Sequence, residues 1–202
     1  MINSGEAGWE PPLPRKPGAL LAVVALVLII AGTAFGLYEL NGALATRYTP
    51  KANACMATEL GSLSTLTSNT KPAIAPDELI KDQCRIQFVR DDGTPTVFGR
   101  VTVQYTGSRL ASRITFGSRT DAIENNDEDN PVQWSTVAGL GEEAWQSMAP
   151  RSCSFKVAVR DVNAVLVIEL AGVPGEELCA RVANADIQKA LAASAKGTLA
   201  KL

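Results

Sequence analysis

The stretch CSFKVAVRDVNAVLVIELAG, residues 153–172, sets the fold class of the chain. Apolar Phe155, Val157 and Val159 alternate with other residues, which is the period of a strand with one buried face. The second half, residues 164–172, is nearly all apolar, which is typical of a central strand that is covered on both faces. Because the intervening DVN is suited to a tight turn, the stretch predicts an antiparallel hairpin near the middle of a sheet.

A second hairpin is predicted upstream. In CRIQFVR, residues 84–90, Ile86 and Phe88 share one face with the cysteine, and VFGRVTVQYTG, residues 97–107, alternates in the same way. The intervening DDGTP is a turn sequence. A short strand is expected around residues 144–148. SRITFGSRTDAIENN, residues 112–126, is ambiguous, and its interpretation is a short strand followed by a short helix.

Helices are predicted on both sides of these strands. ACMATELGSLSTLTS, residues 54–68, has apolar residues at intervals of three and four, and the segment from about Gly175 to the C-terminus has an apolar stripe that includes Val182, Ala185 and Leu191. TKPAIAPDELIKDQ, residues 70–83, contains two prolines and is interpreted as a loop. The expected fold is therefore α+β: an antiparallel sheet with helices packed on one face.

An uncharged apolar run, residues 19–38, precedes this domain. As a helix it would be roughly 30 Å long, which matches the hydrocarbon core of a bilayer. Arg15 and Lys16 stand just before it, and positive charge stays on the cytoplasmic side. We therefore expect a single-pass signal anchor with a cytoplasmic N-terminus and an extracytoplasmic C-terminal domain. A cleaved signal peptide is the alternative, with ALA at residues 43–45 as the cleavage site, but its apolar region would normally be shorter.

The predicted domain organisation follows from this segment. Residues 1–18 are a short, proline-rich cytoplasmic tail that cannot bury a core and is expected to be disordered. Residues 19–38 are the membrane span, residues 39–54 a linker, and residues 55–202 the exported α+β domain.

The chain has four cysteines, Cys55, Cys84, Cys153 and Cys179, all on the side predicted to be exported. An even number in an oxidising compartment predicts two disulfides. Zinc is less compatible because there is no C-x-x-C pair and no histidine, and Cys55 lies too far beyond the apolar run for a lipid anchor. Three pairings are open; we expect Cys55–Cys84 and Cys153–Cys179, because each would join a helix to a nearby strand.

Composition limits the chemistry. The absence of histidine removes Ser-His-Asp and Cys-His nucleophilic systems, and a formal net charge of −2 argues against a nucleic-acid partner. No phosphate-binding glycine loop is found: Gly139 and Gly141, in GLGEEA, are interpreted as structural turn residues that adopt positive φ. We predict no catalytic, cofactor-binding or metal-binding residues and no cofactor.

Paired carboxylates are the one remaining catalytic option, as in glycoside hydrolysis. Glu142 and Glu143 are the first candidate pair. The second is an acidic cluster, whose ordinary interpretation is a solvated loop: Asp121, Glu124, Asp127, Glu128 and Asp129. A calcium site in NNDEDN, residues 125–130, lacks the glycine of an EF-hand loop. A carboxylate-based hydrolase is thus a remote alternative.

Several motifs together resemble a known family. They are CMATELGSL at the first helix, CRIQF at a strand, VAGLGEEAW, CSFKVAV, and ELCARVANADIQKAL in the last helix. This pattern resembles an actinobacterial family of exported domains of unknown function, many of them lipoproteins, and is similar to the extracellular sensor domains of certain mycobacterial serine/threonine kinases. The resemblance implies an α+β sheet with two disulfides in the cell envelope, and it implies no activity. The chain departs from the family in having a membrane span in place of a lipobox.

The function predicted from the sequence is a membrane-anchored, sensor-like domain that binds an envelope ligand or a membrane-protein partner, without catalysis. The alternative is a structural or accessory subunit of a membrane complex. Gly32 and Gly36 form a G-x-x-x-G, which permits close helix packing and weakly supports this alternative.

Overall fold

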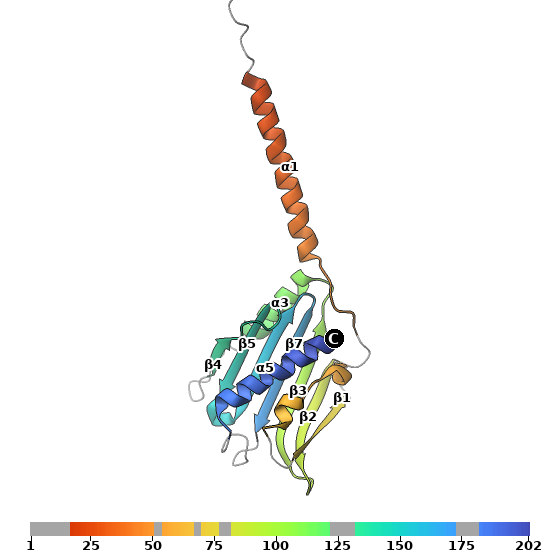
Figure 1. Cartoon of the computed structure of the whole chain (residues 1–202), viewed down its shortest axis with the longest axis vertical. Coiled ribbons are helices and arrows are strands. Elements are labelled where there is room, and N and C mark those ends of the chain that lie inside the picture. The colour runs from red at the N-terminus through yellow and green to blue at the C-terminus, as the bar shows by residue number, and fades with distance from the viewer. Residues whose placement is uncertain (1–16, 51–53, 67–69, 77–81, 122–131, 173–181) are drawn as a thin grey trace, which may run out of the picture. The chain divides into compact units, whose positions relative to one another are not determined.

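The computed structural model describes residues 17–50, 54–66, 70–76, 82–121, 132–172 and 182–202 (Figure 1). The chain divides into two compact units, residues 1–41 and 42–202, which are described separately. The first unit consists mainly of helix α1. The second contains the sheet and the remaining helices.

Helix α1 (Pro17–Ala43) is 27 residues long and begins at a proline, which is favourable in the first turn of a helix. Its segment Val23–Ala43 has 21 residues and a mean hydropathy of 2.2, so it is long and apolar enough to cross a membrane. None of this segment is buried within the protein. A membrane-compatible helix near the N-terminus is therefore confirmed. The helix continues past Tyr38 to Ala43, so the first residues of the predicted linker are helical.

The second unit is built on one seven-stranded antiparallel sheet with the strand order β1-β2-β3-β7-β6-β5-β4. The predicted α+β class is confirmed, and the hairpin of residues 153–172 supplies the centre of the sheet. The strands are β1 (Thr70–Pro76), β2 (Gln83–Arg90), β3 (Pro95–Tyr105), β4 (Gln133–Thr136), β5 (Glu143–Ala149), β6 (Ser154–Asp161) and β7 (Ala164–Gly172).

The main core lies between one face of this sheet and a helical layer. Helix α5 (Asn184–Lys201) crosses this face (Figure 1), and the short helices η1 (Ala54–Ala57) and α2 (Gly61–Ser64) pack beside it. The alternation of the strands directs their apolar residues here. The largest fully buried side chains of this layer are Phe88, Phe155, Leu63, Ile86, Leu166, Ile168, Ile187 and Leu191.

Helix α3 (Arg109–Asp121) departs from the predicted arrangement because it packs on the opposite face. Its Phe116 is 2% exposed and clusters with Ala158, Val165 and Val167, which alternate with the residues of the main core. The short strand expected at the start of residues 112–126 is absent, because the described part of that segment, up to Asp121, is helical. A second, smaller apolar layer thus covers the part of the opposite face formed by β6 and β7.

Strand β1 was predicted as a loop because of its prolines, and that prediction is wrong. Pro72 pairs with Phe88 and Pro76 with Cys84, so both prolines occupy the same alternate positions of an edge strand. A proline has no N–H to donate and is tolerated where that position faces away from the neighbouring strand. The prolines therefore leave the strand intact and make this edge a poor template for pairing with another chain.

Two further differences concern β4 and α5. The short edge strand β4 was not predicted. Within the described residues α5 begins at Asn184, its Ala185 is exposed, and its buried stripe runs from Ile187 to Leu199. The apolar stripe of this helix is therefore shifted from the predicted one, although Leu191 belongs to both.

Candidate functional site

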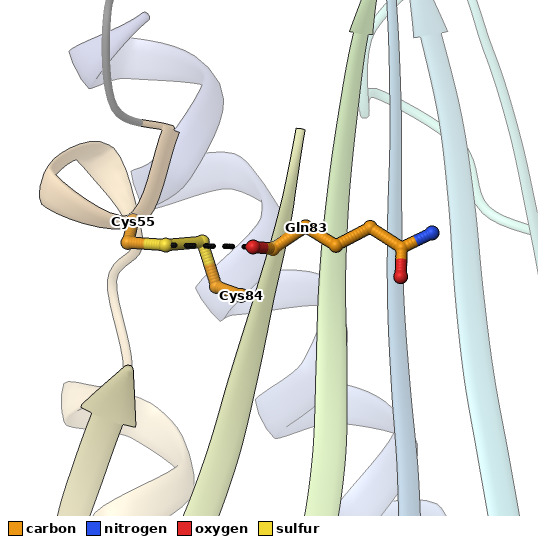
Figure 2. The surroundings of a disulfide bond; sticks show 3 residues. All are labelled: Cys55, Gln83 and Cys84. Carbon is orange, nitrogen blue, oxygen red and sulfur yellow. Dashed lines mark hydrogen bonds between the residues drawn. A yellow bond between two sulfur atoms is a disulfide. The ribbon is translucent and has the colours of Figure 1, made fainter. Parts of the chain in front are cut away.

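The disulfide Cys55–Cys84 is present, as predicted. The two Cα atoms are 5.5 Å apart, and the bond joins the short helix η1 to strand β2 (Figure 2). Cys84 is fully buried, and the Sγ atom of Cys55 lies 3.8 Å from the carbonyl oxygen of Gln83. The bond fastens the start of the domain to its sheet, so these cysteines have a structural role.

Cys153 is also disulfide-bonded, and none of the cysteines in the described part of the chain is free. Its predicted partner Cys179 lies outside the described residues. The same is true of Arg15 and Lys16, on which the predicted membrane topology rests. The presence of a disulfide is typical of a domain that matures in an oxidising compartment.

The GLGEE segment forms a sharp turn that packs on strand β6. Gly139 has φ +72° and Gly141 has φ +61°, while Leu140 between them is 5% exposed. A Cβ atom at Gly141 would lie 2.7 Å from both the carbonyl oxygen of Arg160 and Cγ1 of Val159. These two glycines therefore have the predicted structural role.

The first pair of candidate carboxylates is held in ion pairs. Glu142 Oε1 accepts a hydrogen bond from Arg109 Nε at 2.7 Å, and its Oε2 accepts one from Arg160 Nη1 at 2.5 Å. Glu143 Oε2 accepts one from Arg160 Nε at 3.3 Å. Burial acts to raise the pKa of Glu142, but the hydrogen bonds and charges of Arg109 and Arg160 outweigh it and lower the pKa. A carboxyl group kept ionised in this way is poorly suited to act as a general acid.

The acidic cluster of residues 121–129 lies almost entirely outside the described residues, so the structure does not test it as a catalytic or metal site. Asp121 is the last residue of α3, and Glu124, Asp127, Glu128 and Asp129 lie outside the described residues, as does the NNDEDN segment. Within the described ranges, no group of three or more His, Cys, Asp or Glu side chains is placed to hold a metal ion.

The turn between β6 and β7 fixes the segment that follows α1. Asn163 is 3% exposed, and its Oδ1 accepts hydrogen bonds from the backbone N–H groups of Arg47 at 2.7 Å and Tyr48 at 2.8 Å. Its Nδ2 donates to the carbonyl oxygens of Tyr48 at 2.8 Å and Thr106 at 3.3 Å. All the polar atoms of this buried amide are thereby satisfied, so Asn163 is a structural anchor.

Asp161 reinforces this attachment. Its Oδ2 accepts a hydrogen bond from the Tyr48 hydroxyl at 2.5 Å and from Arg47 Nη1 at 3.0 Å. Tyr48 is 7% exposed. Burial, followed by the hydrogen bond to Asp161 and the charge of that carboxylate, raises the pKa of Tyr48 to about 12.

This shift predicts a loss of stability at high pH. Since the folded-state pKa of Tyr48 lies above its ordinary value of 10.0, the neutral hydroxyl contributes stability that is complete below pH 10 and is lost as the pH rises towards 12. We expect absorbance titration of the full chain in detergent micelles to show a late tyrosinate step near pH 12. Tyr48→Phe should remove that step and flatten the alkaline loss of stability, whereas an unchanged titration curve would contradict the assignment.

An open cavity of about 550 Å³ lies on the face of the sheet opposite α5. Most of its lining side chains alternate with the core residues of β2, β3, β5, β6 and β7, and Ile86, Gly99 and Leu170 also line it. Its size is in the ordinary range for small-molecule sites. The side chains that characterise it are Arg85, Phe98, Arg100, Lys156, Glu169 and Ala171.

The strand register arranges these side chains in two adjacent rows across the sheet. The charged row runs from Arg85 to Arg100, Glu169, Lys156 and Ser147, each residue directly opposite the next. The second row, two residues along each strand, runs from Gln87 to Phe98, Ala171, Ser154 and Ala149. A charged row therefore lies beside a row of mostly small or apolar residues.

None of these cavity residues was predicted as a site. The signal in the sequence was weak: Arg85 and Gln87 alternate with buried residues as in any half-exposed strand. Phe98 was an apolar residue at a position of the polar face, but only the strand register brings it beside Ala171.

Comparison with models of known protein families gives no match for this chain, and a search of curated proteins gives none either.

Proposed function

We propose that this protein is a single-pass, membrane-anchored domain of the cell envelope that binds a ligand at the open cavity on the extracytoplasmic side. The observation that carries the proposal is the cavity itself, formed by side chains from five neighbouring strands of one sheet. A site on paired strands is held in place before a ligand arrives, which lowers the cost of ordering it on binding.

The location rests on three features. Val23–Ala43 is able to span a bilayer, the domain that follows contains a disulfide, and Arg15 and Lys16 precede the apolar run. Positive charge on the N-terminal side favours a cytoplasmic N-terminus, and a disulfide favours an oxidising environment for the domain. The resemblance to exported four-cysteine domains and kinase sensor domains agrees with this location and remains part of the proposal.

A binding role without catalysis is the simplest account of the described polar groups. Glu142, Arg160, Asp161 and Asn163, which are buried or ion-paired, form bonds that hold the fold together. Among the described residues that line the cavity, the one carboxylate is Glu169, and its Oε1 is 2.7 Å from Lys156 Nζ. This supports recognition of a ligand more than acid–base chemistry upon it.

The proposal is tested by thermal unfolding of the full chain in nanodiscs. The probes are soluble peptidoglycan fragments, short oligosaccharides, short peptides and short-chain lipids. We expect one class to raise the melting temperature by several degrees at concentrations well above its Kd, as mass action requires. Ala171→Trp, which fills the cavity from an exposed position of β7, should abolish the rise.

The matched control is Ala193→Trp at an exposed position of α5, on the other side of the sheet, where the rise should persist. The proposal fails if no probe class raises the melting temperature. It fails equally if the rise survives in Ala171→Trp, because the ligand would then bind elsewhere.

A further inference from the structure

Two arginines lie at one end of the cavity. Arg85 and Arg100 are directly opposite each other on β2 and β3, both are exposed, and both line the cavity. Like charges in this position repel and destabilise a strand pair. Among the described residues, neither guanidinium forms a salt bridge, so no described carboxylate compensates for this repulsion.

The nearest carboxylate in the register does not neutralise the pair. Glu169 is opposite Arg100, but its carboxylate is bound by Lys156 on the other side at 2.7 Å. Among the described lining residues, three cations, Arg85, Arg100 and Lys156, thus stand against one carboxylate, a net charge of +2 for this described set. Two adjacent guanidinium groups are a favourable arrangement for a carboxylate or phosphate, because each presents a planar set of donors.

An apolar surface lies beside this charge. Phe98 is 43% exposed at the cavity wall, and Val132, Ala149 and Ala171 continue the apolar lining towards β5. The small side chains in this row leave the space that the cavity occupies. The two rows are ~7 Å apart along the strands, and the apolar row extends ~14 Å across the three strand spacings from β3 to β5.

We propose that the cavity binds a small anionic amphiphile, with its carboxylate or phosphate head group on Arg85 and Arg100 and its hydrocarbon chain along Phe98, Val132, Ala149 and Ala171. This inference rests on the proposed function and specifies the ligand class. A neutral glycan would leave the arginine pair uncompensated, and a simple inorganic anion would leave the apolar row empty. An amphiphile with one negative head group would pair that group with the two arginines and cover the apolar row with its hydrocarbon chain.

The test is calorimetric titration of the full chain in nanodiscs of zwitterionic phosphatidylcholine, with the heat of empty nanodiscs subtracted. The probes share one chain length: octanoate, octyl phosphate and octan-1-ol. We expect at least one of the two anions to bind, and the identity of that anion distinguishes a carboxylate ligand from a phosphate ligand. The R85Q/R100Q variant should bind it at least tenfold more weakly, because the charge-assisted hydrogen bonds are lost.

The matched control is K189Q/K196Q, which removes two exposed positive charges from α5, across the sheet from the cavity. It should change the Kd less than twofold and retain the wild-type melting temperature. R85Q/R100Q should melt at or slightly above the wild-type temperature, because the repulsion between the two arginines is removed. Binding of octan-1-ol as tightly as the anions, or an unchanged Kd in R85Q/R100Q, would overturn the anionic assignment.

The two proposals fail in different ways. If a neutral probe raises the melting temperature and Ala171→Trp abolishes that rise, while neither anion binds, the cavity is a ligand site of another class. If neither the anions nor any of the thermal-shift probes bind at the cavity, the proposed function fails as well.

Discussion

Replacing Asn163 by alanine should lower the free energy of unfolding of the domain by about 4 kcal/mol. The side chain is buried and makes four hydrogen bonds, so its removal leaves two backbone N–H groups and two carbonyl oxygens without this partner. Each buried polar group left unsatisfied costs about 1–3 kcal/mol, and partial access of water reduces the sum. Urea unfolding of the full chain in micelles, followed by tryptophan fluorescence, measures the loss.

Asn184→Ala is the matched control. Asn184 is exposed at the first residue of α5, and its replacement should change the free energy of unfolding by less than about 0.5 kcal/mol. A loss below about 1 kcal/mol in Asn163→Ala would show that water replaces the amide without penalty, and the β6–β7 turn would then not be the anchor of the segment after α1.

Gly141→Ala is the second substitution with a large expected effect, a loss of about 3–4 kcal/mol. The left-handed backbone at φ +61° costs about 1–2 kcal/mol for an L-residue. The added Cβ would lie 2.7 Å from the carbonyl oxygen of Arg160 and from Val159 Cγ1, and forced displacement in a packed region costs about 1–3 kcal/mol more. The same urea unfolding assay measures this loss.

Gly139→Ala separates the two contributions. Gly139 has a similar φ of +72°, but no atom lies within 4 Å of a Cβ placed there. This variant should therefore incur only the backbone cost, about 1–2 kcal/mol. Equal losses for the two glycines would mean that the contact with β6 does not constrain the turn.

The strands with strong alternation could be predicted from the sequence because burial on one face determines which residues they contain. The segments 84–90, 153–161 and 164–172 became β2, β6 and β7 almost residue for residue. The cysteine pairing Cys55–Cys84 could be inferred because it joins neighbouring elements. These features depend on local pattern and on short separation along the chain.

The elements that were missed or only partly predicted depend on tertiary contacts. Helix α3 contains Ile114, Thr115 and Gly117, which have low helix propensity. The packing of Phe116 on β6 and β7 supplies the stabilisation of the helix that these residues do not provide. Strand β1 forms despite its prolines because it lies at an edge. The cavity was not predictable, because Arg85, Phe98 and Ala171 belong to three strands and only the register brings them together.

A topology reporter tests most directly the proposal that the domain lies on the extracytoplasmic side of a membrane. Alkaline phosphatase fused after Leu202 is active only where its own disulfides form, whereas green fluorescent protein at the same position fluoresces in the cytoplasm. In a bacterial host we expect an active phosphatase fusion, a dark fluorescent-protein fusion, and both in the membrane fraction. An inactive phosphatase with a bright fluorescent-protein fusion would place the domain in the cytoplasm and contradict the account.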